Sequence, residues 1–553
     1  MISWRARAIA KAKAVTTITN SNFGKFYDSI ENERGQILVL ALCGHFGRKG
    51  AGHQACPYIG ADARQEAFAY PSMPLPQGKK VFHEQRAAWA KSLKDKGYTD
   101  EMISYEAARE VFEHRSRLSS VLQLYYHGGV KELMKGQRQW DPSMKRDLDD
   151  YLKLSLEKQW QFAYPDVTPR IHISEGGNLL RRFRGYPKLI EVFLPKLRLL
   201  VDVNWRISNT GRYADYILPC AAQYERDDTR NSTPFPFAYL HGAERAIDPV
   251  GESLQEWTIH CMLAKKIQER AIQRGLTHFK DRAGKERRLD NVYHELTYAG
   301  CYTENDTVKL AQDFVKVSEN LKGTTWDELA KNGFVRFTSI GEAHVNIGNA
   351  TDLRPGEPVT PNTWHVQKKM PWPTLTRRIQ FYIDQELFLE LGEELPVYKE
   401  DHIGGNYPLR LTGGHARHSI HTSWRDDTLM LRLQRGEPEM YMNVRDAQAR
   451  GIKDHELVRV YNDVGAFEIR AKVAASCAPG EVIIYHAWEP YMFKDGYSHQ
   501  TLTPSPINPI ELAGGYFHLR PMLFSCSPGQ SDRGVRVEVN KLEKAGPHPG
   551  LRV

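Results

Sequence analysis

The chain has 553 residues, enough for about three to four domains of ordinary size. Hydrophobic residues make up 41% and charged residues 26%, which excludes a disordered, collagen-like or coiled-coil chain, and no apolar run approaches the ~18 residues that a membrane-spanning helix needs. The net charge of +8, from 75 basic and 67 acidic residues, permits an anionic partner, but no block of Lys and Arg indicates nucleic acid binding.

Residues 1–60 are predicted to form a helix, a strand, a loop, a second helix and a glycine loop. The first helix has basic residues without a following apolar region, so it is not a secretory signal, and the strand at Val15–Thr19 is expected to be buried. Gly44, Gly47 and Gly50 follow the apolar run Ile37–Cys43, and their N–H groups can approach a phosphate or a flat ring. A plain surface turn is the alternative. A chain that opens in mid-pattern like this is expected to be a fragment.

Residues 61–165 are predicted to be an inserted helical region without a catalytic signature. Apolar residues recur at helical spacing in Phe82–Lys96, Tyr105–Tyr126 and Met144–Gln159. The next part of the chain, residues 166–345, changes to an α/β pattern with helical segments, among them the amphipathic run Leu254–Gln273.

The α/β pattern predicts a parallel sheet with a binding edge. Strands are expected at Arg170–Ser174, Leu197–Val203 and Ala214–Pro219, with a helix at Lys188–Phe193. Strand, helix and strand within ~30 residues form a βαβ unit, and ligands of such sheets lie at the carboxyl ends of the strands. The residues expected at this edge are Gly176, Gly177, Asn178, Asp202 and Asn204. A turn role for Asn178 and a cap or turn role for Asp202 are the alternatives.

Residues 346–404 are predicted to be a linker, and residues 405–553 to be rich in β-strands. Five prolines fall between Pro355 and Pro373, which is typical of a connector without regular structure. Further along, short strands alternate with turn residues, and this pattern predicts a small barrel. The expected strands are Leu409–Thr412, Leu457–Tyr461, Phe467–Val473 and Val482–Tyr485.

The densest group of reactive side chains follows the first of these strands. It comprises Thr412, Gly413, Gly414, His415, Arg417, His418, Ser419, His421 and Thr422. Three histidines at spacings of three invite a zinc site, but zinc prefers four close ligands, and a loop after two glycines offers no shared helix face. We favour a polar cradle without a metal, in which glycine N–H groups approach an anion and the side chains donate hydrogen bonds. Ordinary surface histidines are the third interpretation.

Four segments in order resemble the molybdopterin oxidoreductases of the dimethyl sulfoxide reductase family. They are Ile37–Gly52, then Val201–Trp205 with Thr210–Pro219 and Glu225, then Thr412–Thr422, then Met442–Asp454 with Val458–Gly465. Within the family, the chain is most similar to the catalytic subunits of ethylbenzene dehydrogenase and of relatives acting on steroid side chains, selenate, chlorate and dimethyl sulfide. The segments that indicate this are Asn20–Tyr27, His418–Asp427, Gly514–Pro521 and Ser531–Glu538.

The resemblance implies a fold and a cofactor. The expected fold is an α/β region with a parallel, Rossmann-like sheet, followed by a C-terminal, double-psi-like β-barrel that binds a dinucleotide. The implied cofactor, bis-molybdopterin guanine dinucleotide, needs backbone amides for its phosphates, an acid for guanine or ribose, and polar groups for the pterin edges. Asn508 and Tyr516 complete the set of residues predicted to bind it.

The chain also departs from the family pattern. Members carry an N-terminal iron–sulfur domain with clustered cysteines and an aspartate that ligates molybdenum, whereas the seven cysteines here include no C-x-x-C. The chain therefore resembles the C-terminal half of such a subunit. The implied partners are the missing N-terminal half, an iron–sulfur β subunit and a haem γ subunit, in the periplasm by resemblance and otherwise in the cytoplasm. The barrel segment reads Asp454-His455-Glu456 where a glycine-bearing turn is usual.

The resulting functional hypothesis is a molybdenum-dependent oxidoreductase that hydroxylates a hydrocarbon-like small molecule with water or reduces an oxyanion. The alternative is a non-catalytic cofactor-binding fragment of the same fold. In the hydrocarbon-hydroxylating relatives a lysine near molybdenum helps to move protons, and the resemblance places that catalytic role on Lys25. An exposed lysine at a helix start is the other interpretation of Lys25.

Overall fold

The computed structural model describes most of the chain in two compact units. The described residues are 2–19, 23–55, 61, 70–113, 120–161, 167–231, 238–281, 284–340, 350–416, 419, 421–519 and 533–542. The first unit comprises Met1–Asn20, Gln36–Glu110 and Pro219–Ile379, and the second comprises Ser21–Gly35, Val111–Leu218 and Gln380–Val553. No helix within the described residues is both long enough and apolar enough to span a membrane. The segment boundaries expected from the sequence stay predictions.

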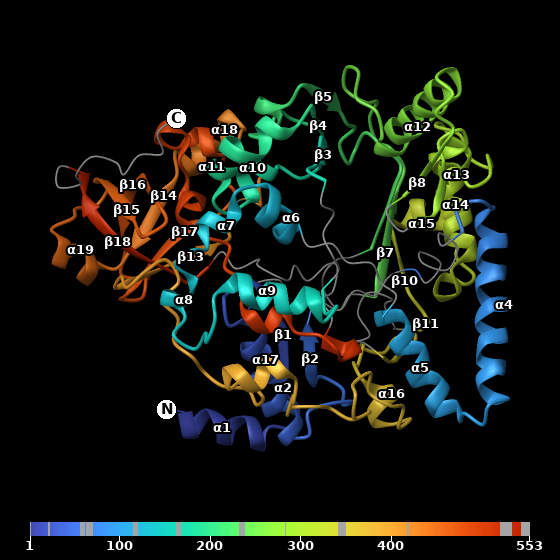
Figure 1. Cartoon of the computed structure of the whole chain (residues 1–553), viewed down its shortest axis with the longest axis horizontal. Coiled ribbons are helices and arrows are strands. Elements are labelled where there is room, and N and C mark those ends of the chain that lie inside the picture. Colours follow the sequence, from blue (N-terminus) through green and yellow to red (C-terminus); the bar gives the residue numbers. More distant parts are fainter. Residues whose placement is uncertain are drawn as a thin grey trace. The chain divides into compact units, whose positions relative to one another are not determined.

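The first unit consists of helices around three small sheets and a parallel strand pair. Its helices are α1 (Ile2–Lys11), α4 (Leu75–Lys94), α12 (Glu256–Gln273), α13 (Val292–Leu296), α14 (Thr307–Val317), α15 (Trp326–Asn332) and α16 (Thr363–Val366). The division between the units falls within two further helices, so that this unit includes α2 (Ser29–Leu42) from Gln36 onward and α5 (Asp100–Glu113) up to Glu110. The strands are β1 (Thr16–Thr19), β2 (Gly52–Ala55), β6 (Asp228–Asn231), β7 (Tyr239–Ala243), β8 (His278–Lys280), β9 (Glu286–Arg288), β10 (Phe334–Arg336), β11 (Ser339–Ile340) and β12 (Asp352–Leu353). Figure 1 shows these elements in blue, green and yellow.

Local sequence explains where elements of the first unit begin. Thr325 caps α15 by accepting from the N–H of Glu328, whose side chain accepts from the N–H of Thr325 in return, so two N–H groups at the helix start are satisfied. Trp326 and Leu329 of this helix are then buried in the core of the unit.

Two expectations for the first unit are wrong. The strand at Val15–Thr19 forms as β1, but it is not buried, since the side chain of Ile18 is 62% exposed. The connector at 346–375 contains regular structure, because β12 pairs with β11 and the Trp364 side chain of α16 donates to Asp352 of β12. Proline-rich sequence favours irregular chain only when no partner strand or side chain satisfies the backbone.

The second unit contains helices and an α/β sheet. Its helices are α6 (Ser120–His127), α7 (Val130–Leu133), α8 (Gln137–Trp140), α9 (Leu148–Glu157), α10 (Leu179–Arg182), α11 (Tyr186–Lys188), α17 (Glu386–Leu391), α18 (Thr428–Met430) and α19 (Val444–Arg450). Helix α9 buries Leu148, Tyr151, Leu152 and Ser155, which lie on one face at the 3.6-residue period. Short single helical turns, among them η1 (Phe23–Lys25) and η7 (Pro490–Met492), connect the longer elements.

The sheet of the α/β region has three strands in the described residues. They are β3 (Ile171–Glu175), β4 (Leu199–Asn204) and β5 (Tyr216–Pro219), in the order β3-β4-β5. Strands β3 and β4 are parallel, with Ser174 opposite Asp202. The predicted parallel pairing is therefore present, but only as a small sheet, and the larger Rossmann-like sheet stays a prediction.

The C-terminal part of the second unit is a closed six-stranded barrel, as the sequence predicted. Its strands are β13 (Leu409–Gly414), β14 (Glu439–Met442), β15 (Leu457–Tyr461), β16 (Ala466–Val473), β17 (Glu481–Tyr485) and β18 (Val535–Lys541), in the order β13-β17-β14-β16-β15-β18. The sequence pattern missed β14 and β18, and β18 closes the barrel by pairing with both β13 and β15. Figure 1 shows these strands in orange and red.

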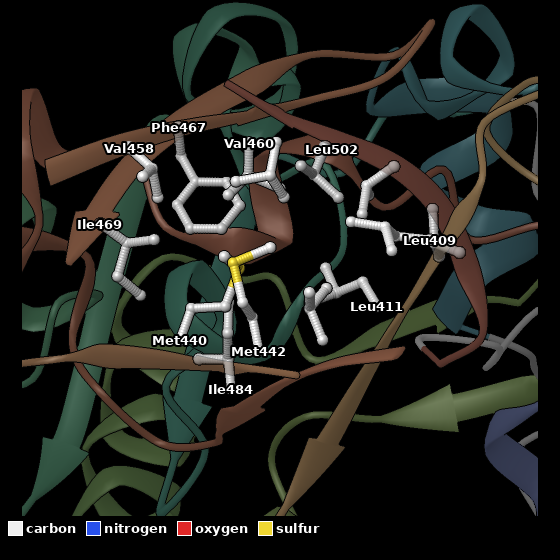
Figure 2. Close-up of a cluster of buried hydrophobic side chains, with 14 of the residues drawn as sticks. Leu409, Leu411, Met440, Met442, Val458, Val460, Phe467, Ile469, Ile484 and Leu502 are labelled. Carbon is white, nitrogen blue, oxygen red and sulfur yellow. The ribbon is translucent and has the colours of Figure 1, made fainter. Parts of the chain in front are cut away.

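The barrel interior is filled by alternate residues of its strands (Figure 2). Val458 and Val460 of β15 point inward with Phe467 and Ile469 of β16, and all four are buried. Strand period two places every second side chain on the inner face. The turn at Asp454–Glu456 keeps its shape without glycine, because His455 adopts the left-handed φ of 62° that glycine usually supplies.

Candidate functional site

The site begins where two parallel strands of the barrel end together. Strands β13 and β17 are parallel, and Thr412, Gly413 and Gly414 pair in register with Ile483, Ile484 and Tyr485. His415 and His486 therefore leave adjacent strand ends, and their ring centroids lie 4.3 Å apart. His421, from the loop after β13, joins them, with its ring centroid 5.0 Å from that of His415 and 5.2 Å from that of His486.

These three residues, His415, His421 and His486, form the histidine triad. One ring nitrogen from each lies within 4.8 Å of the others. Nδ1 of His486 lies 2.7 Å from the carbonyl oxygen of Gly414, so it carries the proton and donates. Nε2 of His486 is then the acceptor for Nδ1–H of His421, at 2.9 Å. The lowered pKa values of His421 and His486 favour the neutral form of both rings, which agrees with this arrangement.

Positive charge gathers around the triad. Burial lowers the pKa of His486 to about 4, the Gly414 carbonyl opposes this, and the charges of His415, His421 and Lys25 lower the pKa further. Burial also lowers the pKa of His415, with added contributions from Arg533 and Lys25. The pKa of His421 is lowered by burial, then by His415, Lys25, Arg181 and Arg182. Because these cations converge on one point, the site favours an anion over another cation.

Arg181 of α10 is a further buried cation near the triad. Burial lowers the pKa of this guanidinium to about 10, against the attraction of Glu489. Its Nε atom is buried and has no hydrogen-bond partner in the described part of the chain. A buried cationic donor of this kind is satisfied by an acidic ligand.

The loop after β13 holds the remaining residues of the predicted cradle. The buried hydroxyl of Ser419 has no hydrogen-bond partner within the described ranges, and Thr422 contributes its carbonyl to the N–H of Arg425. There is space beside Gly413 for a ligand atom, since an added Cβ there would lie 3.6 Å from its nearest neighbour, Nε of Arg533. A Cβ at Gly414 would instead lie only 3.1 Å from the Tyr485 ring. Arg417 and His418 lie outside the described residues.

Two of the predicted residues at the sheet edge, Asn178 and Asp202, make hydrogen bonds within the protein, although Oδ1 of Asp202 is buried and has no hydrogen-bond partner in the described residues. Both carboxylate oxygens of Glu489 accept from Nδ2 of Asn178 at 2.9 Å. Asp202 is fully buried and accepts from the Ser208 hydroxyl at 2.9 Å, in the loop where Gly211 packs against its carboxylate. Burial is the largest influence on the Asp202 carboxyl and raises its pKa. The hydrogen bond of Asp202 to Ser208 is local, between β4 and the loop that follows it, and the cofactor-binding role of Asn178 and Asp202 stays a prediction.

Four further predictions can be placed. Gly177 and the buried Asn204 follow β3 and end β4, at the same end of the parallel pair. Asn508 caps a helical turn by accepting from the N–H of Ile510 and donates to the carbonyl of Tyr27. The hydroxyl of Tyr516 donates to Asp384 at 2.7 Å. A cofactor-binding role for each of them stays a prediction.

The glycine loop belongs to the first unit. Gly44, Gly47 and Gly50 all have positive φ, between 67° and 73°. A Cβ at Gly47 would lie 2.7 Å from Cβ of Val366, so this glycine is required by packing against α16. Packing therefore explains Gly47 without a ligand, and its predicted cofactor contact stays untested.

Sequence reasoning missed the residues that complete the site, namely His486, Arg181, Arg533 and Glu489. His486 had a usable signal, since it directly follows the predicted strand Val482–Tyr485, as His415 closely follows the strand at Leu409–Thr412. What the sequence did not show is that these two strands are parallel neighbours, which only the barrel topology reveals.

Comparison with known proteins agrees with the barrel and the sheet. Residues 409–518 match the family model "Molydopterin dinucleotide binding domain", and residues 188–266 match the model "Molybdopterin oxidoreductase". The respiratory nitrate reductase alpha subunit of Haloferax mediterranei is 31% identical over 97% of this chain and 51% of its own length. The dimethylsulfide dehydrogenase alpha subunit of Rhodovulum sulfidophilum is 30% identical over 97% of this chain and 54% of its own.

The perchlorate reductase alpha subunit of Dechloromonas aromatica is 36% identical over 68% of this chain and 40% of its own length. The chain thus spans about half the length of these relatives or less. The particular similarity to ethylbenzene dehydrogenase stays a prediction.

The residues at the strand ends fit the pyrophosphate and ring edges of a molybdopterin dinucleotide. Arg181, Lys25 and Arg533 supply positive charge beside the triad, and the buried Ser419 hydroxyl supplies a donor that no described residue uses. All three triad histidines and Ser419 lie inside the matched range 409–518. The chain therefore carries a molybdopterin oxidoreductase segment and a molydopterin dinucleotide-binding domain, and its relatives are alpha subunits of molybdopterin oxidoreductases.

Proposed function

We propose that this chain is the dinucleotide-binding part of a catalytic subunit that exchanges an oxygen atom between water and a small molecule, using bis-molybdopterin guanine dinucleotide. The observation that supports this most is the histidine triad at the carboxyl ends of β13 and β17, within the matched range 409–518, together with the positive charges of Lys25, Arg181 and Arg533 that act on it. The molybdenum cofactor, when bound, supplies the two-electron redox chemistry.

The residues of the chain bind and orient in this proposal. Arg181 attracts anionic groups by its charge, and the hydrogen bonds of His486 to Gly414 and to His421 hold the triad rings in place beside it. Lys25 places a further positive charge beside the triad, where it can hold and move a proton.

The substrate class that the relatives favour is an oxyanion. Two of the relatives are named for the reduction of nitrate and perchlorate, and one for the dehydrogenation of dimethyl sulfide. The hydrocarbon-like substrate expected from the sequence is the second candidate. Assaying the assembled subunit with reduced viologen and nitrate or perchlorate, and with an oxidant and ethylbenzene, separates the two. Partner subunits belong to the proposal because the relatives are alpha subunits.

Cofactor binding is tested on the chain produced in a host that makes the cofactor. Molybdenum is measured by mass spectrometry and guanosine monophosphate after acid release. Gly413→Asp is expected to abolish both, because the new carboxylate would lie beside the Arg533 guanidinium and take the place of the anionic ligand. A negative charge in a partly desolvated anion site costs several kcal/mol, on the order of an unpaired buried charge.

Two variants serve as controls for Gly413→Asp. Gly413→Ala tests the added bulk alone, since its Cβ would meet only ordinary contacts. Ala475→Asp adds the same charge at an exposed turn of the same barrel. Both are expected to retain the cofactor. A folded wild-type chain without molybdenum or guanine nucleotide contradicts the proposal, and normal cofactor content in Gly413→Asp contradicts the assignment of the cradle.

A further inference from the structure

The loop from His486 to Glu489 carries one member of the triad and is held in an unusual conformation. Ala487 has a φ of 79°, a left-handed value that residues with a Cβ rarely adopt. Backbone of this kind persists only where surrounding contacts determine it. The contacts that hold the loop therefore decide where His486 lies.

The first anchor of this loop is Arg425. This arginine is almost completely buried, and its guanidinium lies 4.2 Å from the ring centroid of Trp488. Its NH2 group donates to the carbonyl oxygen of His486 at 3.0 Å. Arg425 thus holds the loop from the side of the segment that follows His421.

The second anchor is the carboxylate of Glu489, which is fully buried. Four hydrogen bonds converge on it. Nδ2 of Asn178 donates to both oxygens at 2.9 Å, NH2 of Arg206 donates at 2.6 Å, and the N–H of Asn209 donates at 3.2 Å. These donors come from the segments that follow β3 and β4, so Glu489 joins the barrel loop to the edge of the α/β sheet.

The side chain of Glu489 acts only as an acceptor in this arrangement. All four hydrogen bonds run toward Glu489, and a carboxylate accepts at two oxygens without presenting a donor. The amide of Asn178 has no capacity left for a ligand, since its oxygen accepts from the N–H and hydroxyl of Thr210. A glutamine at this position would turn its NH2 group toward Asn178 and toward either Arg206 or the N–H of Asn209, and it would lose the charge that pairs with the arginine.

We propose that Glu489 is a positioning residue for the cofactor site: by anchoring the strained loop, it holds His486 against His421 and Gly414 and fixes the triad relative to the loop after β4. The effect on ligand binding rests on the proposed function. The effect on His486 itself does not, which allows the two to be tested separately.

The position of His486 is tested by its reactivity toward diethyl pyrocarbonate at pH 7, followed on the full chain by peptide mass spectrometry. Glu489→Gln is expected to raise the modification rate of His486 at least fivefold, because the ring loses its hydrogen-bonded place. The exposed His455, on the barrel surface, is the internal reference and should react equally in both proteins.

A second substitution tests whether the hydrogen-bond pattern is responsible. In the double variant Glu489→Gln with Asn178→Asp the donor and acceptor are exchanged, so that the introduced amide donates to the introduced carboxylate and the negative charge stays near Arg206. Aspartate also tolerates the left-handed φ of 79° that Asn178 adopts. The double variant should slow the modification of His486 relative to Glu489→Gln, because it removes the donor–donor contact with residue 178, although the introduced NH2 group still meets Arg206 or the N–H of Asn209. Glu468→Gln, which removes a carboxylate paired with Lys494 at the barrel surface, is the matched control and should leave His486 unchanged.

Guanosine diphosphate is the probe for the ligand. Its Kd, measured by calorimetry, should rise at least tenfold in Glu489→Gln and return toward wild type in the double variant. If the wild-type chain does not bind this probe, the proposed function fails in that respect, while the reactivity of His486 still tests Glu489. If Glu489→Gln does not fold, Glu489→Asp, which shortens the reach by one methylene, replaces it in both measurements. Unchanged His486 reactivity in a folded variant overturns the inference.

Discussion

Nδ1 of His421 and Nε2 of His486 lie 2.9 Å apart although 65 positions separate them in the chain. At least one of the two rings is neutral in this contact, because a doubly protonated ring has no acceptor nitrogen. The burial that surrounds the pair, and the positive charges of Lys25 and the neighbouring histidines, favour the neutral form of His486. The site is consequently built to receive negative charge at neutral pH.

The first prediction concerns acid stability. The pKa of His486 falls from its ordinary value of 6.5 to about 4 in the folded chain, so the unfolded chain binds more protons between these values. The stability due to neutral His486 is present above pH 6.5 and is lost as the pH falls toward 4. We expect the loss of unfolding free energy between pH 6.5 and pH 4 to be smaller in His486→Gln than in the wild type, by about 1–2 kcal/mol once solvent screening is allowed for.

The measurement for His486 is urea unfolding at intervals from pH 4 to pH 7. His455→Gln, at an exposed barrel turn, is the control and should follow the wild-type profile. A wild-type slope that survives in His486→Gln would assign the acid sensitivity to other groups.

The second prediction concerns the pH dependence of stability that arises from Asp28, a residue to which no function in the candidate site is assigned. Burial raises the pKa of this carboxyl to about 8, helped by the charges of Asp401, Glu393 and Asp141 and opposed by Lys399. The folded chain therefore binds more protons than the unfolded chain between pH 4 and 8, and stability falls as the pH rises through this window. Asp28→Asn should remove that loss.

We expect Asp28→Asn to stabilise the chain by about 2–4 kcal/mol at pH 8.5 and to have little effect at pH 4. Thermal unfolding at the two pH values measures the difference. Asp150→Asn, at an exposed position of α9, provides the comparison. Equal effects of Asp28→Asn at both pH values would show that its carboxyl is ionised in the folded chain.

The third prediction concerns Lys25. Its charge acts on all three triad histidines, which places it beside the proposed ligand site. In the assembled enzyme, Lys25→Met should lower kcat by ~10²-fold or more if the amine transfers a proton. Molybdenum and guanine nucleotide content should stay at the wild-type level, because the residue that is replaced does not hold the cofactor alone.

Lys494→Met, which removes a lysine paired with Glu468 at the barrel surface, is the matched control for turnover. A Lys25→Met enzyme with wild-type kcat and cofactor content would make Lys25 an ordinary surface lysine. Loss of the cofactor together with kcat would instead assign Lys25 to binding.

The fourth prediction tests the barrel as a packing unit. Phe467 is buried with Val458, Val460 and Ile469 in its interior (Figure 2). Phe467→Ala should lower the free energy of unfolding by about 3–5 kcal/mol, since the cavity adds to the lost burial. Leu433→Ala removes a largely exposed side chain and should cost far less. Chemical denaturation compares the two, and equal losses would contradict a closed barrel core.

The sequence by itself determined the local elements and the family. Alternating apolar residues located the strands from Leu457 to Tyr461 and from Phe467 to Val473 close to where they form, because the two-residue period of a strand is a local property. The cradle loop after Gly414 was also visible, since two glycines and three histidines follow one strand directly. The family followed from motifs whose order along the chain is itself informative.

Only the tertiary structure decided which residues from distant parts of the chain become neighbours. His486 lies beside His415 only because β13 and β17, which are about 70 residues apart in the chain, pair in parallel. The local sequence pattern predicts strands but not the order in which they pair. Asn178 has the side chain of a ligand-binding residue, yet Glu489, 311 positions away, takes its amide. In the same way, the apolar residue Ile18 was expected on a buried strand, but its side chain is 62% exposed in the folded chain. Burial and hydrogen-bond partners depend on contacts between distant segments, and these contacts exist only in the folded chain.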